Sequence, residues 1–134
     1  MVSKPSQSVS LRTKKDKRSL PLLRVVISGV ASRQALLMDQ LDDLQLAVEI
    51  LLVEEGEGNG DMLLEVSPLG GGLSVAIAGL GNQRLKKSLL GERTESESQE
   101  FVFDARMLLE ALVDAFRVDE TTDGAYTVQL EKRA

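Results

Sequence analysis

The sequence predicts an α+β domain: a two-layer sandwich in which three helices cover one face of a mainly antiparallel sheet of four or five strands. Three observations lead to this prediction. The stretch 36–55 has apolar residues at spacings of three and four, which is typical of an amphipathic helix. Alternating stretches meet at Gly70-Gly71-Gly72, and another pair flanks Asp123-Gly124. Both arrangements are typical of β-hairpins.

The amino-terminal part predicts a strand followed by a helix. Alternation over 8–12 favours a short edge strand, and Pro21 suits the first turn of a helix over 21–34. Arg24 and Arg33 fall outside the apolar stripe of this helix. The stripe is expected to contain Leu22, Val25, Val26, Gly29 and Val30.

The organising helix is predicted over 39–55, with Asp39 as its N-cap and Gly56 ending it. Its last apolar run, 50–53, is expected to be buried on more than one side. The predicted buried face consists of Leu37, Leu41, Leu44, Val48 and Leu51. The polar residues Asp42, Asp43, Gln45 and Glu49 are placed on the other side.

The carboxyl-terminal half predicts two hairpins separated by a helix. The first pairs a strand over 62–66, ended by Ser67-Pro68, with a strand over 73–78 whose apolar face is Leu73, Val75 and Ile77. Residues 85–90 suit one or two helical turns, and 91–100 a mobile loop. A helix over 104–116 then precedes strands over 116–119 and 125–130. Asp104 is its expected cap, Phe103 and Leu108 a hydrophobic staple, and Met107, Leu108, Ala111, Leu112 and Ala115 its stripe.

The composition narrows the chemistry that is open to the chain. Its 134 residues suit one domain, placed at 8–134 after a disordered leader at 1–7. The chain has no cysteine and no histidine, which removes disulfides, thiolate metal sites and the commonest general base. Neither a signal peptide nor a membrane-spanning run is evident, so a cytoplasmic protein without a membrane partner is expected.

Charge divides the chain into two parts. Six basic residues against one acidic residue give residues 1–19 a net charge of +5, so residues 20–134 carry −10 of the total of −5. An acidic body does not favour nucleic acid, and no nucleic-acid partner is expected. The basic segment suits a solvated leader or a lysine-flanked edge strand, and the alternative is contact with nucleic acid, an anionic surface or an acidic partner.

Three stretches together resemble the histidine-kinase-like ATPase (GHKL) fold, shared by histidine kinases, gyrase-type ATPases and bacterial anti-sigma factor serine kinases. They are 23–33, the helix segment D-D-L-Q-L-A-V-E at 42–49, and Asp123-Gly124 with 128–132. The resemblance covers most of residues 20–132. It is nearest to the small serine kinases that regulate sigma factors by partner switching, as in sporulation.

The nucleotide motifs that this resemblance implies are altered in the sequence. The family's long helix carries a general-base Glu and, four residues on, an Asn that helps hold Mg²⁺; these positions are Ile50 and Glu54 here. An isoleucine accepts no proton. The family's D-x-G-x-G keeps only Gly79 and Gly81, and the glycine turn that closes over the phosphates is absent from 101–105. No catalytic residue and no metal or cofactor site is therefore predicted, with Glu54, Gly79 and Gly81 as the weak candidates for nucleotide contact.

The favoured hypothesis is an anti-sigma-like binding module that has lost nucleotide binding and kinase activity. The resemblance implies a sigma factor or an anti-sigma antagonist as its partner, and possible pairing with a second copy. The residues expected at the contact are Arg24, Arg33, Asp42, Asp43 and Glu49. Two alternatives remain: an active serine/threonine kinase that uses ATP and Mg²⁺, with Glu49 or Glu54 on the metal and Lys86 or Lys87 on the phosphates, and a pseudo-domain paired with a true kinase. An exposed apolar patch on the first helix would favour the last reading.

Overall fold

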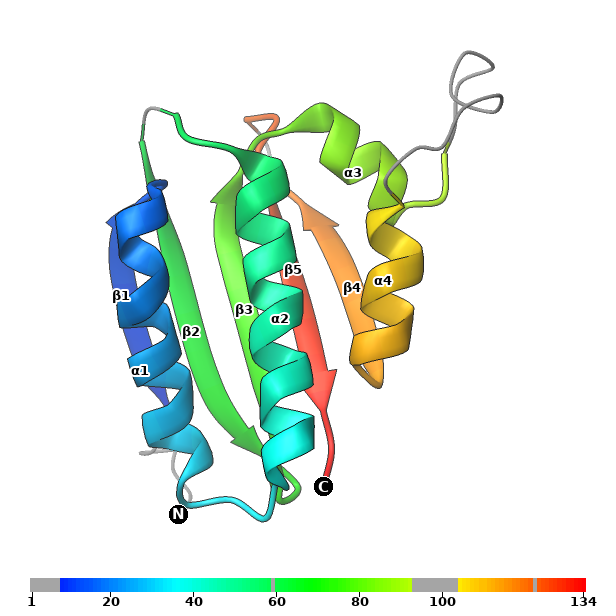
Figure 1. The fold of residues 1–134 in the computed structure, drawn as a ribbon. Coiled ribbons are helices and arrows are strands. Elements are labelled where there is room, and N and C mark those ends of the chain that lie inside the picture. The colour runs from blue at the N-terminus through cyan, green and yellow to red at the C-terminus, as the bar shows by residue number, and fades with distance from the viewer. Residues whose placement is uncertain (1–7, 59, 93–103, 122) are drawn as a thin grey trace, which may run out of the picture.

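A computed structural model describes residues 8–58, 60–92, 104–121 and 123–134 (Figure 1). The predicted leader at 1–7, most of the predicted loop and the staple residue Phe103 lie outside these residues. The elements are β1 (Val9–Lys14), the 3₁₀ turn η1 (Lys17–Ser19), α1 (Leu20–Ala31), α2 (Met38–Glu55), β2 (Asp61–Leu69), β3 (Gly72–Leu80), α3 (Gln83–Leu89), α4 (Ala105–Leu112), β4 (Ala115–Glu120) and β5 (Tyr126–Lys132).

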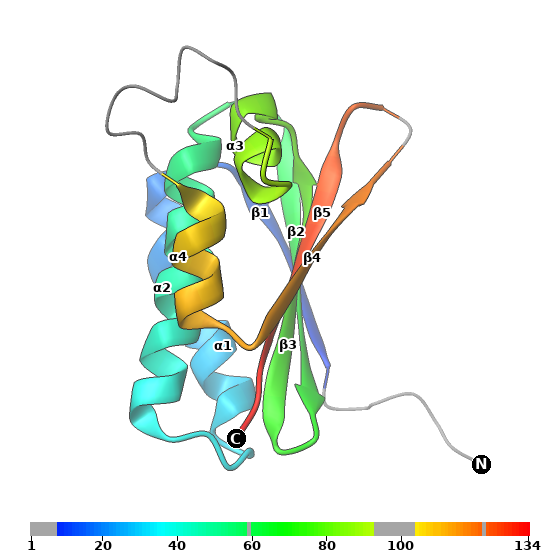
Figure 2. The same cartoon turned by 90° about the vertical axis from the view of Figure 1, so that its right-hand side faces the viewer.

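The strands form one antiparallel sheet in the order β1-β2-β3-β5-β4. All the helices lie on one face of it, and the other face is open (Figure 2). The predicted α+β sandwich is therefore confirmed. The predicted number of helices was wrong, because the described residues form four α-helices; the additional one, α3, lies in the stretch that was left undecided. None of the described helices is long and apolar enough to cross a bilayer.

The core lies between the sheet and the helices. Alternate residues of β2, β3 and β5 point under the helices, as the period of two requires. They are Met62, Leu64 and Val66 from β2; Leu73, Val75 and Ile77 from β3; and Tyr126, Val128 and Leu130 from β5, and all are buried. The predicted apolar face of β3 is thus confirmed, and Tyr126 is the one aromatic residue among these buried strand positions.

The β2–β3 hairpin turns at Gly70-Gly71, and both residues have positive φ (54° and 90°). The two-residue turn that joins twisted strands requires this conformation, which glycine adopts readily. The prediction that Ser67-Pro68 ends β2 was wrong. Pro68 stays in the strand opposite Leu73, beyond the last β2 residue that pairs with β1, where a missing N–H is tolerated. A Cβ at Gly72 would lie 2.0 Å from the Lys132 carbonyl oxygen, so β3 and β5 can approach closely only because this residue is glycine.

Helix α1 buries a face that overlaps the predicted one only in part, at Val30 and the partly buried Val26. Its buried residues are Leu23, Ile27, Val30 and Ala31, whereas Leu22 and Val25 are exposed. The sequence of α1 is apolar almost all round, so the spacing rule fits two faces, and packing on β2 and α2 selects between them. The unselected face is left in solvent.

Three details of α2 also differ from the prediction. The helix begins at Met38, so Asp39 lies in its first turn and Leu37, placed on the buried face, is its exposed N-cap residue. Gln45 is buried, and its amide donates to the Arg24 carbonyl (3.3 Å) and the Ser28 hydroxyl (2.9 Å) of α1. Val53, expected inside, is exposed. Gly56 ends the helix at φ +80°, as predicted.

Helix α4 starts after Asp104, whose carboxylate accepts the Met107 N–H as predicted. It ends at Leu112 rather than at 116, because Val113 is extended and the Asp114 N–H pairs with Glu131 in the sheet. The predicted stripe was correct only at Leu112, which packs against the core. Ala105 and Leu109 are buried instead, Met107 and Leu108 are exposed, and Ala115 belongs to β4. The β4–β5 hairpin around Asp123-Gly124 is confirmed.

Candidate functional site

The end of α2 carries a buried carboxylate. The Glu55 side chain is only 5% exposed and forms an ion pair with the Lys15 Nζ at 3.0 Å. It also accepts the backbone N–H groups of Gly81 and Asn82, each at 2.9 Å. A buried carboxylate needs this number of donors, because removing the charge from water is costly unless it is paired and hydrogen-bonded. Glu55 therefore joins three segments: the end of β1, the end of α2 and the start of α3.

Asn82 and Tyr126 extend this arrangement towards β5. The Asn82 side chain accepts the Leu85 N–H as the cap of α3 and donates to the Glu54 carbonyl. The Tyr126 hydroxyl donates to the Asn82 carbonyl at 2.8 Å. Burial, reinforced by the Glu55 carboxylate, raises the pKa of Tyr126 far above its usual value. We call Lys15, Glu55, Gly81, Asn82 and Tyr126 the Glu55 cluster.

The two candidate glycines have local structural reasons to be there. Gly79 lies at a register shift between β3 and β5, with φ +90° and the Asp61 carbonyl oxygen 2.8 Å from where a Cβ would sit. Any other residue there would be strained. The Gly81 N–H is already bound by Glu55. Neither glycine requires a phosphate ligand to explain its position.

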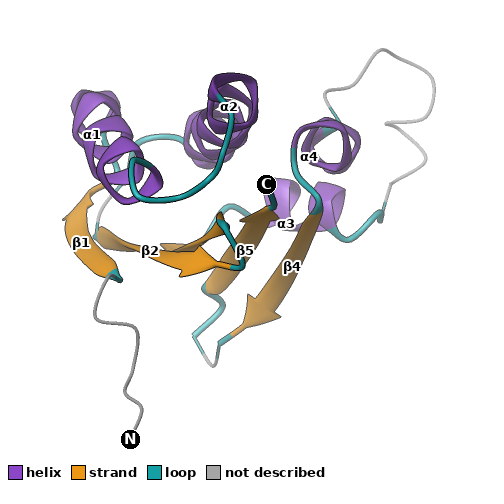
Figure 3. Ribbon diagram, turned by 90° about the horizontal axis from the view of Figure 1, so that it is seen from below, coloured by secondary structure: helices purple, strands orange, loops and turns teal. Residues whose placement is uncertain are grey.

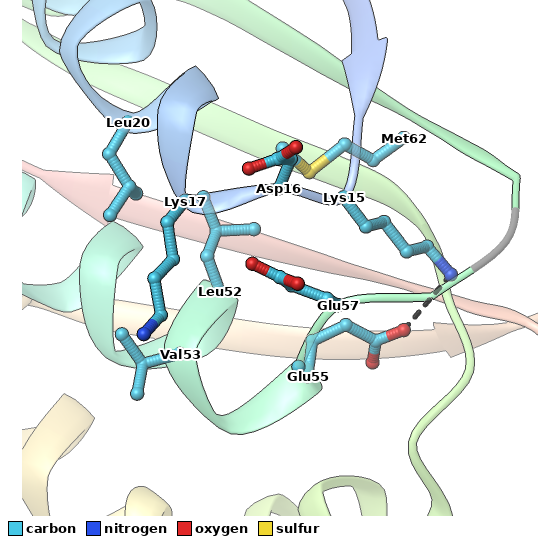
Figure 4. A pocket seen from close by; sticks show the side chains of 10 residues that line it. Lys15, Asp16, Lys17, Leu20, Leu52, Val53, Glu55, Glu57 and Met62 are labelled. Atoms are coloured by element: carbon cyan, nitrogen blue, oxygen red, sulfur yellow. Dashed lines mark hydrogen bonds and ion pairs between the residues drawn. The ribbon is translucent and has the colours of Figure 1, made fainter.

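A small hollow opens beside the Glu55 cluster, between η1 and the end of α2 (Figure 4). Its volume is about 60 Å³, well below the roughly 300–1,000 Å³ of most small-molecule pockets. Both apolar side chains and charges of both signs line it. The lining residues are Lys15, Asp16, Lys17, Leu20, Leu52, Val53, Glu55, Gly56, Glu57 and Met62.

The positions at which the resemblance implies a base and a metal ligand do not line this hollow. Ile50 and Glu54 are half-buried residues of α2, and no side-chain hydrogen bond of Glu54 is formed in the described part of the chain. Glu49 and Glu54 are five residues apart and so point about 140° apart on the helix, which separates the two acids proposed for a metal. Among the described residues, no three acidic side chains gather as a metal site would require.

The lysines of α3 are also separated from one another. Lys86 forms an ion pair with Glu120 of β4 at 3.2 Å, whereas Lys87 is exposed. The neighbouring Ser88 hydroxyl accepts the Ala105 N–H and thereby fixes the start of α4. These contacts hold α3 against β4 and α4.

The predicted contact residues divide into two groups. Arg24 and Glu49 pair with each other across α1 and α2, and Asp43 lies 3.5 Å from the Lys132 ammonium. The first pair joins α1 to α2, and the contact of Asp43 joins α2 to β5. Arg33 and Asp42 are exposed, and neither has an ion pair in the described part of the chain. The two groups could not be distinguished from the sequence, because the ion pairs depend on which helix packs against which.

The outer surface of the helix layer carries apolar side chains. Val25 of α1 is 67% exposed and Val53 of α2 is 61% exposed, and Leu22 and Leu46 are exposed on the same two helices. Residue types alone indicated charged residues as the contact surface, and Leu22, Val25 and Val53 were predicted to be buried. Only the position of α1 on the sheet reveals them.

The Glu55 cluster was not predicted from the sequence. Glu55 was taken as the polar end of a helix, and Lys15 as part of a polar connection. One signal was present: Asn82 followed by a helical stretch is a typical N-cap. The partners of Glu55 are 40, 26 and 27 residues away, and no local pattern joins them.

Comparison with known proteins adds no assignment to this geometry: no family model matches the chain, and no curated protein matches its sequence.

Proposed function

We propose that this protein is a non-catalytic protein-binding module of the anti-sigma type, whose partner is a sigma factor or an anti-sigma antagonist. The observation that carries the proposal is the outer face of α1, where Leu22, Val25 and Gly29 are exposed. Exposed apolar side chains such as Leu22 and Val25 on one helix of a small domain are typical of protein interaction sites. The same face would also serve a pseudo-domain that pairs with a true kinase, so the identity of the partner that binds distinguishes the two readings. A helix laid into a groove, or a groove laid over a helix, is a common way of using them.

The loss of nucleotide binding is supported by how the end of α2 is occupied. Backbone N–H groups at a glycine-containing turn are the groups that bind phosphate in many nucleotide sites. Here the two N–H groups after β3 are bound by the Glu55 carboxylate of the same chain. A phosphate would have to displace this carboxylate, and the negative charge of Glu55 would then remain close to the negative charge of the phosphate. Ile50, at the family's base position, offers no proton acceptor.

The proposal is tested by mixing the purified protein with a panel of purified sigma factors and antagonists, and measuring complex formation by size-exclusion chromatography and titration calorimetry. We expect one partner to bind and Val25→Glu to weaken it at least tenfold. Val53→Glu is the matched control, because it places the same charge at a similarly exposed valine on α2. Failure of every sigma factor and antagonist to bind would refute the proposal.

The kinase alternative is separated by thermal unfolding with and without Mg-ATP or Mg-ADP, followed by circular dichroism because the chain has no tryptophan. A ligand that binds only the folded state raises its stability by about 2.7 kcal/mol at a hundredfold excess over Kd. We expect no shift at millimolar nucleotide. A clear shift, with ATP turnover lost in Glu54→Ala, would favour the kinase.

A further inference from the structure

One edge of the sheet is open along a whole strand. β1 pairs with β2 through Val9↔Val66 to Lys14↔Asp61, and no described strand lies on its other side. α1 lies over the covered face near this edge (Figures 1 and 3). An edge strand presents unpaired backbone N–H and C=O groups, and an extended peptide can add to them as a further strand.

The charged side chains of β1 point to the open face of the sheet. Arg12 and Lys14 are exposed, and neither forms an ion pair within the described residues. Asp61 is the cross-strand neighbour of Lys14 but does not pair with it. The opposite edge is different: on β4, Arg117 is bound by Asp119 at 2.9 Å and by Gln129. The unpaired cations of the sheet edges are therefore on β1.

The other face of β1 is apolar and continues onto α1. Val9 and Leu11 lie opposite Val66 and Leu64, which are core residues, so they point towards the helix layer. Val9 is 39% exposed and Leu11 is half-buried. A residue on a strand added beside β1 would therefore meet an apolar surface on this face.

The outward flank of α1 completes that surface. Arg24 pairs with Glu49 of α2 and the Ser28 hydroxyl binds Gln45, so these two residues mark the side of α1 that faces α2. Residues two positions apart on a helix point about 200° apart. Leu22 and Val26 therefore point away from α2, above the outer side of β1.

We propose that the β1 edge binds an extended acidic segment of a partner protein as an added strand. Its alternate residues are apolar and pack beneath the outward flank of α1, and the residues between them are Asp or Glu and face Arg12 and Lys14. Successive side chains of a strand point to opposite faces, so this alternation matches both surfaces of the edge at once. The inference rests on the proposed binding function and names the chemistry of the partner.

The first test is titration calorimetry with a capped synthetic peptide of about seven residues that alternates glutamate and valine. We expect binding that weakens at least tenfold in the double variant Arg12→Glu, Lys14→Glu. The matched control is Arg84→Glu, Lys87→Glu: it makes the same change of net charge at two exposed cations of α3, and it should change the affinity less than about twofold. A peptide alternating lysine and valine should not bind. Equal loss in both double variants would show a general charge effect and would overturn the proposal.

The second test distinguishes strand addition from surface attraction. Two peptides are compared, one N-methylated at the odd positions and the other at the even positions. These are the two phases of methylation, and they differ because alternate N–H groups of an added strand face β1 or solvent. We expect one phase to abolish binding and the other to retain it. Equal effects of both phases overturn the proposal. So does a homodimer through β1 that excludes the peptide, or an oligonucleotide that binds with the same dependence on Arg12 and Lys14.

The outcomes separate this inference from the proposed function. If a sigma factor or antagonist binds and the variant at Arg12 and Lys14 leaves that affinity unchanged, only the edge-strand inference fails. If none of the panel binds but the peptide binds with the expected phase dependence, the edge is a peptide site and the anti-sigma assignment fails.

Discussion

Two regions on either side of η1 differ in whether their polar groups have partners and their apolar groups are buried. In the Glu55 cluster, a carboxylate, an ammonium, two backbone N–H groups and a phenol hydroxyl are brought together and paired. At the β1 edge and the solvent-facing surface of α1, which together we call the open edge, cations are unpaired and Leu22 and Val25 are exposed. Both regions begin within a few residues of each other, at Lys14 and Lys15.

The difference indicates which region contributes to the stability of the fold and which can contribute free energy to the binding of a partner. Groups that already have partners contribute to folding and have little left to offer a ligand. Exposed apolar side chains and unpaired backbone groups contribute little to folding, and they release free energy when a partner covers them. Substitutions should therefore affect stability in the Glu55 cluster and binding at the open edge.

The largest effect on stability is expected from Glu55→Ala. It leaves the Lys15 ammonium and the N–H groups of Gly81 and Asn82 without their acceptor, at a cost of about 2–4 kcal/mol. The measurement is urea unfolding followed by circular dichroism. Glu54→Ala is the matched control on the neighbouring residue, with an expected change within about 0.5 kcal/mol. Equal effects of the two substitutions would show that the paired groups of the Glu55 cluster contribute no particular stability.

A smaller effect is expected from Tyr126→Phe, about 1 kcal/mol for the hydrogen bond to Asn82. The raised pKa of Tyr126 adds a pH dependence. The folded state holds this proton more tightly, so the contribution is complete below the unfolded pKa of about 10 and is lost as pH rises above it. The difference in unfolding free energy between wild type and variant should be constant below that pH and shrink above it.

The same group can be observed directly, because Tyr126 is the only tyrosine of the chain. Absorbance of the tyrosinate should show a midpoint well above 10 in the folded protein and near 10 in denaturant. A folded midpoint near 10 would mean that the hydroxyl is in solvent and the cluster is open at this end.

Loss of the ion pair between Arg24 and Glu49 is expected to change the free energy of unfolding by an intermediate amount. Its side chains are 55% and 24% exposed, and exposed pairs contribute about 0.2–1 kcal/mol. A double-mutant cycle with Arg24→Ala and Glu49→Ala measures the coupling, which should fall as salt rises. A coupling above this range would place the contact between α1 and α2 among the main determinants of stability.

The smallest change in stability is expected from Val25→Glu, within about 0.5 kcal/mol, because this side chain is exposed. The same substitution is expected to have a large effect on partner binding. Unfolding and binding measured on one preparation check both parts. A destabilisation above 2 kcal/mol would show that Val25 is buried in solution and would remove the contrast between the two regions.

Most of the architecture was predictable because it is local. Turn glycines at 70 and 71, Asp104 as a cap and Gly56 as a helix end act over a few residues, and all were identified. The buried face of α1 was not, because its spacing allows two faces. The burial of Gln45 was missed for a related reason: a polar residue on a helix is normally placed in solvent, unless a neighbouring helix supplies its partners.

The sequence by itself determined the two layers, the order of the strands and of every helix except α3, and the absence of histidine and cysteine chemistry. Periodicity and turn residues carry that information along the chain. Only the tertiary structure decided that Glu55 is buried with Lys15, that Leu22 and Val25 are exposed, and that Arg12 and Lys14 lie unpaired on an open strand. These outcomes depend on residues far apart in sequence and on competition between helices for one sheet, which no local pattern records.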